Sequence, residues 1–186
     1  MPDLLSLFLG VFLTALAFLG FARLAGFSAQ RPSDYAGSEP AMDIRHHLDG
    51  PIRCEGVIYG PLGRVNSRFV ARMEGRWDGP SGLLDEHFRY ATGTEQHRQW
   101  RLTMGNDGSV RAQADDIIGT GIGWQEGASL QLKYRIRLPE SAGGWVLDVT
   151  DWMYLCENGT IINRSQFRQF GIKVAELVAT MRRVPV

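Results

Sequence analysis

The sequence is poor in the residues that usually build a metal or redox site. It contains only two cysteines, Cys54 and Cys156, and four histidines in 186 residues. Neither cysteine belongs to a Cys-x-x-Cys motif or a Cys/His cluster, so no zinc site is expected. His46 and His47 are adjacent on a short predicted helix and would point in different directions, which also argues against a metal. We therefore predict no metal and no cofactor, and interpret the cysteines as small buried residues, with a disulfide as the alternative.

Net charge and catalytic motifs are missing as well. Lys+Arg and Asp+Glu both total 20, and a neutral chain has no general electrostatic reason to bind nucleic acid. The sequence has no Gly-x-Ser-x-Gly and no His-Glu-x-x-His motif. The glycine-rich run 119–123 lacks the rest of a phosphate-binding loop, so it predicts a turn or bulge. Catalytic residues are therefore unknown, and an enzymatic role is less favoured than a binding role.

One long apolar run is present at the N-terminus. Residues 4–22 carry no charge over 19 positions, nearly enough for a helix rising about 1.5 Å per residue to span about 30 Å of hydrocarbon. We predict a transmembrane helix or uncleaved signal anchor over residues 1–23. A cleaved signal peptide is the alternative, although no Lys or Arg precedes the run. Asp3 before it and Arg23 and Arg31 after it would, by the positive-inside rule alone, place the following domain in the cytoplasm.

The remainder of the chain is predicted to be all-β. Residues 24–41 are polar and contain prolines, which indicates a tether, and residues 42–186 form the main domain. From residue 52, alternating apolar and polar residues between glycine-containing turns give eight or nine strands at a spacing of roughly ten residues. Residues 172–182 fit a helix by propensity, but their β-branched residues favour a last strand. This pattern is typical of an antiparallel barrel or sandwich.

Two predicted hairpins place charged residues on apolar strand faces. The Asn-Gly pair at 158–159 is the strongest signal for a two-residue turn, which puts Asp151 and Arg164 in diagonal positions on one face. In an earlier hairpin Glu86 is expected opposite Trp100, diagonal to Arg98. An acid and an arginine on an apolar face predict an interior polar layer, because a buried charge requires a partner.

Aromatic side chains add a second feature of interest. Five tryptophans are present, and filling the core explains most of them, whereas some could line a pocket for an apolar ligand. Three carboxylates on strand faces also allow a two-carboxylate hydrolase as a weaker interpretation. The candidate ligand-binding residues are Glu86, Arg98, Trp100, Asp116, Trp124, Tyr134, Asp151, Trp152, Asn163 and Arg164.

The order of several motifs resembles a known bacterial family. The motifs are GLLDEHF at residues 82–88, RQW at 98–100, ADDIIG at 114–119, DWMY at 151–154, NR at 163–164 and FGI at 170–172. Over residues 43–182 the chain is similar to the family catalogued as domain of unknown function 3833. The resemblance implies a lipocalin-like or calycin-like β-barrel, often an exported lipoprotein. No cysteine follows the apolar run for acylation, so an uncleaved helix would serve as the anchor at the inner membrane, with the domain in the periplasm.

Three functions fit these expectations. The first is a membrane-anchored module that binds a lipid or other hydrophobic molecule at the cell envelope. The second is an enzyme that acts on a lipid-linked substrate through interior carboxylates. The third is a structural partner of another membrane protein, which predicts a filled barrel and an exposed apolar patch.

Overall fold

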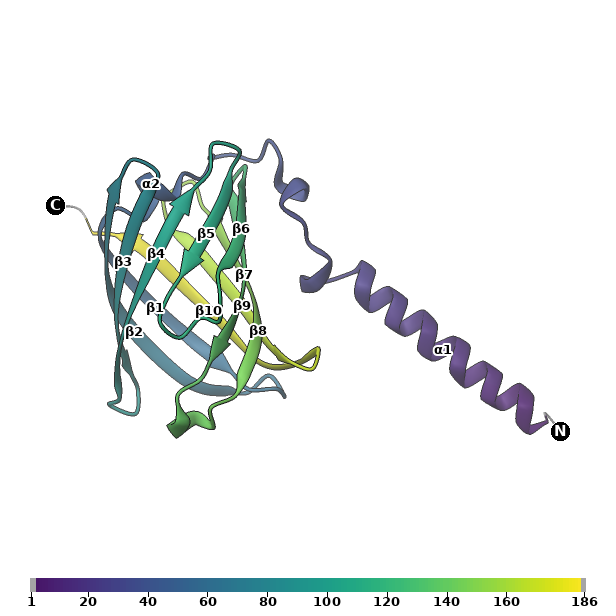
Figure 1. The fold of residues 1–186 in the computed structure, drawn as a ribbon. Coiled ribbons are helices and arrows are strands. Elements are labelled where there is room, and N and C mark those ends of the chain that lie inside the picture. Colours follow the sequence, from purple (N-terminus) through teal and green to yellow (C-terminus); the bar gives the residue numbers. More distant parts are fainter. Residues whose placement is uncertain (1–2, 185–186) are drawn as a thin grey trace.

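A closed β-barrel of ten antiparallel strands forms the body of the protein (Figure 1). The computed structural model describes residues 3–184, so the outermost residues of the predicted segments 1–23 and 42–186 lie outside it. Each strand pairs with the next along the chain, and the last closes on the first. The strands are β1 Gly50–Tyr59, β2 Val65–Asp78, β3 Ser81–Tyr90, β4 Glu95–Met104, β5 Ser109–Gln113, β6 Gly121–Glu126, β7 Ser129–Arg137, β8 Val146–Leu155, β9 Ile161–Gln169 and β10 Ile172–Arg183.

The strand count differs from the predicted eight or nine because β6 lies in the glycine-rich run that predicted only a turn or bulge. Gly121 and Gly123 face inward on this strand, where a side chain has no room. A Cβ on Gly123 would lie 2.4 Å from the carbonyl oxygen of Gln131, and one on Gly121 would lie 3.1 Å from Cβ of Tyr134. The glycines here permit close approach of β6 to β7 rather than ending the sheet.

Gly123 provides a test of this close approach. Gly123→Ala should lower the free energy of unfolding by about 1–3 kcal/mol, because the new methyl group must push β6 away from β7. Chemical unfolding followed by tryptophan fluorescence measures the change. Gly60→Ala is the matched control: its nearest contact would be 3.9 Å away, so we expect a change within about 0.5 kcal/mol. Equal effects of the two substitutions would contradict the packing argument.

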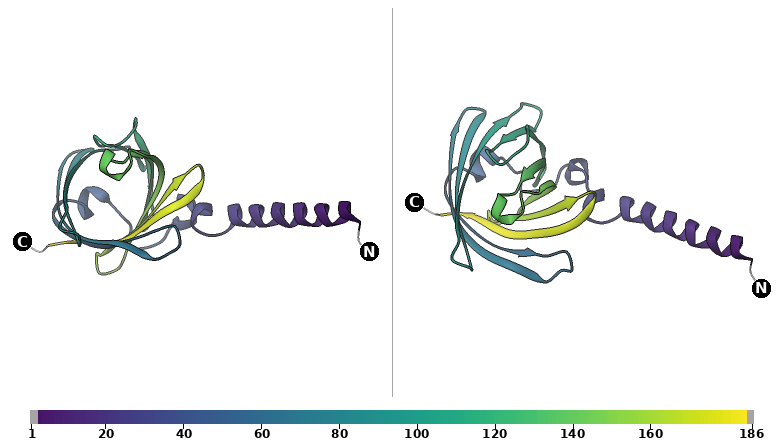
Figure 2. Two further views of the ribbon diagram at one scale, coloured as in Figure 1. Left: turned by 90° about the horizontal axis from the view of Figure 1, so that it is seen from below. Right: turned by 60° about the horizontal axis from the view of Figure 1, so that its bottom comes forward.

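The N-terminal part contains all but one of the helices that the structure describes. A helix forms where one was predicted, and Figures 1 and 2 show it extending away from the barrel. Most of its large apolar side chains are exposed. Within residues 3–184, however, no helix has both the length and the apolarity needed to cross a membrane. The predicted transmembrane helix is therefore not supported. The helices are α1 Leu4–Leu24, η1 Phe27–Ala29, η2 Pro32–Tyr35, α2 Ile44–His47 and, between β7 and β8, η3 Glu140–Ala142.

The segment predicted as a tether packs on the outside of the barrel. The ring of Tyr35 lies 5.3 Å from that of Trp152 and 5.5 Å from that of Tyr154, both edge-on. The Tyr154 hydroxyl donates a hydrogen bond to Oε1 of Gln30 at 2.6 Å. Tyr35 and Gln30 together hold this segment against β8.

One end of the barrel is closed by α2. Asp43 caps this short helix by accepting a hydrogen bond from the backbone N–H of Arg45 at 3.0 Å. Ile44 and Leu48 are buried in the core, and the left view of Figure 2 shows α2 lying across the ring of strands. A Cβ on Gly75 would lie 1.7 Å from the carbonyl oxygen of Leu48, so glycine is required where β2 passes the C-terminal end of α2.

The hairpin between β8 and β9 has a different register from the predicted one. Cys156 and Thr160 are joined by a backbone hydrogen bond of 2.8 Å, so the loop has three residues, and of these only Gly159 has a positive φ, 76°. A three-residue loop with glycine at its end is the next most common hairpin after the two-residue one. The shift of one residue moves every β9 side chain to the opposite face. Arg164 therefore faces outward and Ser165 faces inward.

The register of the β3–β4 hairpin also differs from the predicted one, but by two residues. Glu86 pairs directly with Arg98, and Leu84 with Trp100, whereas the prediction placed Glu86 opposite Trp100. A shift of two residues leaves each side chain on its predicted face, because side chains alternate along a strand. The last strand, predicted over 172–182, is confirmed as β10. The two cysteines are free, so the alternative of a disulfide between them is not realised.

Candidate ligand-binding cavity

The barrel interior holds a cavity of about 660 Å³. It extends from Ile44 and Leu48 at the α2 end to Leu138 and Pro139 in the connection after β7, at the opposite end. Most of the lining comes from inward-facing apolar side chains of the strands. Pockets for small molecules have volumes of about 300–1,000 Å³ and combine an apolar wall with a few polar groups. The few polar groups in this cavity would therefore orient a bound ligand.

Arg98 is the only arginine of β4 that faces the interior. Its Nε donates a hydrogen bond to Oδ1 of Asp116 at 3.1 Å. Its Nη2 lies 3.1 Å from the same oxygen but makes no hydrogen bond with it, and this buried atom has no other partner among the described residues. Asp116 lies in the connection between β5 and β6 and not on a strand. Arg98 thus retains hydrogen-bonding capacity at Nη2, in a cavity with a largely apolar wall.

Two aromatic rings hold the guanidinium of Arg98 in place. Its Cζ lies 4.0 Å from the centroid of the Trp100 ring and 5.9 Å from that of Tyr134. The two rings are themselves edge-on, with centroids 5.3 Å apart. A cation over an aromatic face gains electrostatic stabilisation that increases when water is excluded. Trp100 and Tyr134 therefore position the charge as well as fill the core.

A second polar group lies across the cavity on β8 and β9. Oδ1 of Asp151 accepts a hydrogen bond from the hydroxyl of Ser165 at 2.7 Å and another from the side-chain amide of Asn163. The same amide donates to the carbonyl oxygen of Trp152 at 3.1 Å. Asp151, Asn163 and Ser165 are all buried. These hydrogen bonds fix the carboxyl group at the cavity wall.

Burial makes two interior carboxyl groups weaker acids than usual. It raises the pKa of Glu86 to about 7; Asp151 and Asp116 add to the increase, and Arg98 opposes it. It also raises the pKa of Asp151 to about 6, against the hydrogen bonds from Ser165 and Asn163. Near neutral pH the layer can therefore contain both protonated and ionised carboxyl groups. Such a layer can donate and accept hydrogen bonds at the polar end of a ligand.

The raised pKa of Glu86 predicts that stability decreases as pH rises. Between the ordinary pKa of about 4.5 and the folded value of about 7, the folded state keeps a proton that the unfolded state has lost. This stabilisation is complete at low pH and is lost as pH rises through the folded pKa. Glu86→Gln removes the titration, so at pH 8 the variant should be more stable than the wild type by roughly 3 kcal/mol, and at pH 5 by about 1 kcal/mol or less.

Unfolding by urea at pH 5 and pH 8 measures this difference. Glu74→Gln is the matched control, since Glu74 is exposed on the outer face of β2 and should change stability by less than about 0.5 kcal/mol at either pH. A Glu86→Gln variant that is less stable than the wild type at pH 8 would show that Glu86 is ionised and well compensated in the folded protein.

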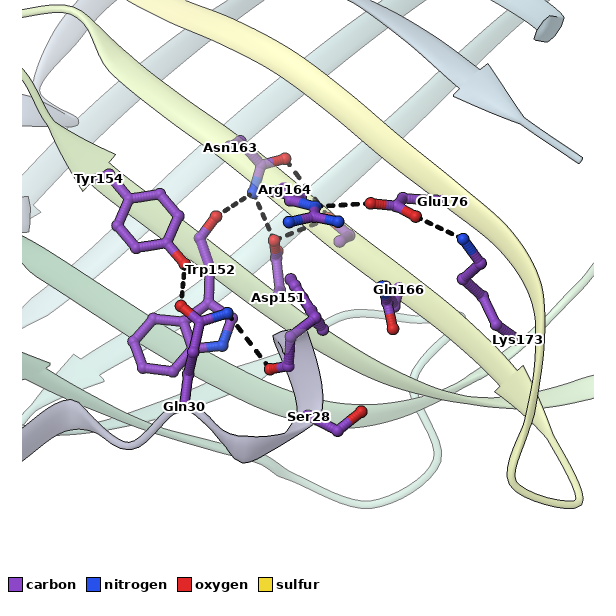
Figure 3. A network of polar contacts seen from close by, with 12 residues as sticks. Ser28, Gln30, Asp151, Trp152, Tyr154, Asn163, Arg164, Gln166, Lys173 and Glu176 are labelled. Atoms are coloured by element: carbon purple, nitrogen blue, oxygen red, sulfur yellow. Dashed lines mark hydrogen bonds and ion pairs between the residues drawn. The ribbon is translucent and has the colours of Figure 1, made fainter. Parts of the chain in front are cut away.

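Seven of the ten predicted ligand residues line the cavity or its wall, and three do not. Trp124 is part-exposed on the outside of β6, and Trp152 is fully buried beneath the N-terminal segment. Figure 3 shows Arg164 pointing toward Glu176 and Lys173 on β10, and Arg164 Nε lies 2.5 Å from Oε1 of Glu176. The seven residues at the cavity are Glu86, Arg98, Trp100, Asp116, Tyr134, Asp151 and Asn163.

Sequence reasoning missed several cavity residues. The predicted register of the β8–β9 hairpin puts Ser165 on the outer face, and the three-residue loop of the structure puts it inside. The Asn-Gly pair alone gives no signal that separates the two loop lengths. Phe88 and Phe167 were treated only as strand residues, although both line the cavity. Phe69 and Phe88 lie edge-on with centroids 5.4 Å apart. These rings form part of the apolar wall that complements the polar layer.

Comparisons with known proteins agree on the family and the fold. The model of the family described as "Protein of unknown function (DUF3833)" matches residues 21–183. No curated protein sequence matches the chain. The S-type phycobiliprotein lyase CPES from Guillardia theta aligns with a TM-score of 0.59 at 9% identity, over 77% of this chain and 92% of that one. Rv2717c from M. tuberculosis aligns with a TM-score of 0.56 at 16% identity, over 80% and 99%. At such identities the likeness shows only a shared lipocalin-like barrel.

Proposed function

The chain belongs to the DUF3833 family of proteins of unknown function, and we propose that its barrel binds one lipid or other hydrophobic small molecule in the interior cavity. The observation that carries this proposal is the cavity of about 660 Å³ with a polar layer inside an otherwise apolar wall. A purely structural barrel would have its interior filled by side chains, so the cavity favours a binding role over the structural alternative.

The energetics favour an amphipathic ligand. Each Å² of apolar ligand surface removed from water contributes about 25 cal/mol, so the apolar wall supplies most of the affinity. Nη2 of Arg98, which makes no hydrogen bond within the described residues, would donate one to the polar end of the ligand. Such a contact gives orientation and specificity more than affinity. The ligand's tail would then lie against the apolar side chains toward α2.

Binding of an apolar fluorescent probe tests the proposal. N-phenyl-1-naphthylamine, which is uncharged and fluoresces in apolar surroundings, should bind the full-length protein in non-ionic detergent with a stoichiometry of one. Its dissociation constant should be micromolar or lower after correction for uptake by detergent alone. Decanoic acid should compete with it. No binding beyond that of detergent micelles would argue against an open interior.

An enzymatic role is the second candidate, and two carboxyl groups favour it. Glu86 and Asp151 line the same cavity and have raised pKa values, a property common among catalytic acids and bases. Hydrolysis of a p-nitrophenyl decanoate substrate would decide this. The enzyme hypothesis expects turnover that Glu86→Gln or Asp151→Asn abolishes while probe binding is kept, and the binding hypothesis expects no turnover above background.

A location in the cell envelope is part of the proposal. It is supported by the resemblance to exported family members, and it predicts that a protease added to spheroplasts cleaves the barrel domain. Protection from protease until the cells are lysed would place the domain in the cytoplasm instead.

A further inference from the structure

A row of five basic side chains crosses the outer face of the barrel over β10, β1, β2, β3 and β4. The strand registers place Arg182, Arg53, Arg72, His87 and His97 directly opposite one another in succession. All five side chains are exposed. Neighbouring strands lie about 4.8 Å apart, so the row is roughly 19 Å long. We call it the basic row.

The three neighbouring arginines of the basic row are unfavourable for the isolated protein. Like charges directly opposite each other on neighbouring strands destabilise a sheet. The ends of the row are partly compensated, since Arg182 pairs with Glu55, and Nε2 of His97 lies 3.6 Å from Asp85. At the centre, Arg53 and Arg72 form no ion pair with any residue that the structure describes. These two charges are available to a partner from outside the chain.

The surface along the basic row is hollowed. Two depressions, of about 1070 and 690 Å³, lie on this face, and Arg53, Arg72, His87 and His97 line both of them. The shared lining means that the depressions meet along the row. A flat bilayer surface does not fit such a groove, whereas an extended chain does.

We propose that the basic row binds an acidic glycan chain. One sugar unit of an extended glycan advances by a distance similar to the strand spacing, so successive carboxylate or sulfate groups can reach successive basic side chains. The groove also contains acids, Glu74 and Asp85 on one side of the row and Glu95 on the other. These carboxylates can accept hydrogen bonds from the sugar hydroxyl groups that lie between the charged groups of the glycan.

The aromatic content of the groove supports the same choice. Proteins that bind single-stranded nucleic acid combine basic residues with aromatic side chains on which bases stack. Among the described residues, Phe88 is the one Phe, Tyr or Trp side chain that lines these depressions, and it faces the barrel interior. The groove therefore offers charge and hydrogen bonding but no outward stacking platform.

Titration of the full-length protein in non-ionic detergent with two glycans tests this inference. Heparin supplies sulfate groups and polygalacturonate supplies carboxylates, with dextran as the uncharged control and oligo(dT) as the nucleic acid. At low salt at least one acidic glycan should bind, and dextran should not. Arg53→Gln/Arg72→Gln should weaken that binding at least tenfold. Arg64→Gln/Arg111→Gln removes the same charge from exposed positions outside the row and should weaken it less than threefold.

Thermal unfolding shows whether the row variant still folds. Removing opposed like charges should leave the Tm equal or higher, so a loss of binding by this variant reports on the groove. No binding of either glycan, or equal losses in the two double variants, would overturn the proposal. Tighter binding of oligo(dT) than of both glycans, dependent on Arg53 and Arg72, would overturn it in favour of a nucleic acid.

Discussion

Replacing Arg98 with methionine should lower the free energy of unfolding by about 3 kcal/mol at pH 8. Arg98 pairs with Asp116, and its side chain is only 14% exposed. Removal of one partner of a buried ion pair leaves the other charge uncompensated at low polarity. The ionised forms of Glu86 and Asp151 also lose stabilisation, because Arg98 opposes the increase in the pKa values of both carboxyl groups. Methionine retains much of the volume, so a cavity contributes little to the effect.

The destabilisation by Arg98→Met should become smaller as the pH is lowered. Without Arg98 the carboxyl groups take up protons at a higher pH, and a protonated carboxyl no longer requires a cation. At pH 5 we expect less than half of the loss seen at pH 8. Urea unfolding at both pH values measures this difference. Arg101→Met is the matched control, because Arg101 pairs with Asp115 on the exposed side of the same strand and should change stability by less than about 1 kcal/mol.

Filling the cavity should abolish binding of the probe. Met153 and Leu177 face the interior from β8 and β10, on either side of β9, and both line the cavity. In Met153→Trp/Leu177→Trp the added indole rings occupy the space that a ligand tail needs. We expect a loss of affinity for N-phenyl-1-naphthylamine of about 30-fold or more, on the order of 2 kcal/mol. Overpacking can cost a further 1–3 kcal/mol of stability by a rough estimate, so unfolding of the variant must be measured beside binding.

The control places the same new rings on the outside of the barrel. Ile122 and Ile172 are exposed, and Ile122→Trp/Ile172→Trp should bind the probe within about threefold of the wild type, less than 1 kcal/mol. A folded cavity-filled variant that still binds the probe as the wild type does would place the probe outside the barrel.

The antiparallel barrel could be predicted from the sequence because its strands alternate clearly and its turns contain glycine. The β6 strand could not, since Gly121 and Gly123 are indistinguishable from turn glycines until their contacts with β7 are known. The same limit applies to the segment before the barrel. Its polar composition indicated a tether, whereas its packing depends on where Tyr35 meets Trp152 and Tyr154.

Strand register determines which side chains of the candidate site face the barrel interior. A register error of an even number of residues leaves each side chain on its predicted face, and an error of an odd number reverses the faces. An error of two residues in the β3–β4 hairpin left Glu86 and Arg98 on the interior face. An error of one residue in the β8–β9 hairpin put Arg164 inside and Ser165 outside, the reverse of the structure. Loop length determines this parity, and the Asn-Gly pair is compatible with two-residue and three-residue loops. A charged residue on an apolar strand face therefore predicts an interior charge reliably only where the length of the hairpin loop is known.

Native mass spectrometry of the full-length protein, purified without a denaturing step and then incubated with a total lipid extract, tests the central claim most directly. The binding account predicts one added molecule per chain, released by organic solvent, and absent from Met153→Trp/Leu177→Trp but present in Ile122→Trp/Ile172→Trp. A wild-type protein that keeps the mass of the bare chain before and after incubation would contradict the proposal that the barrel holds a hydrophobic ligand.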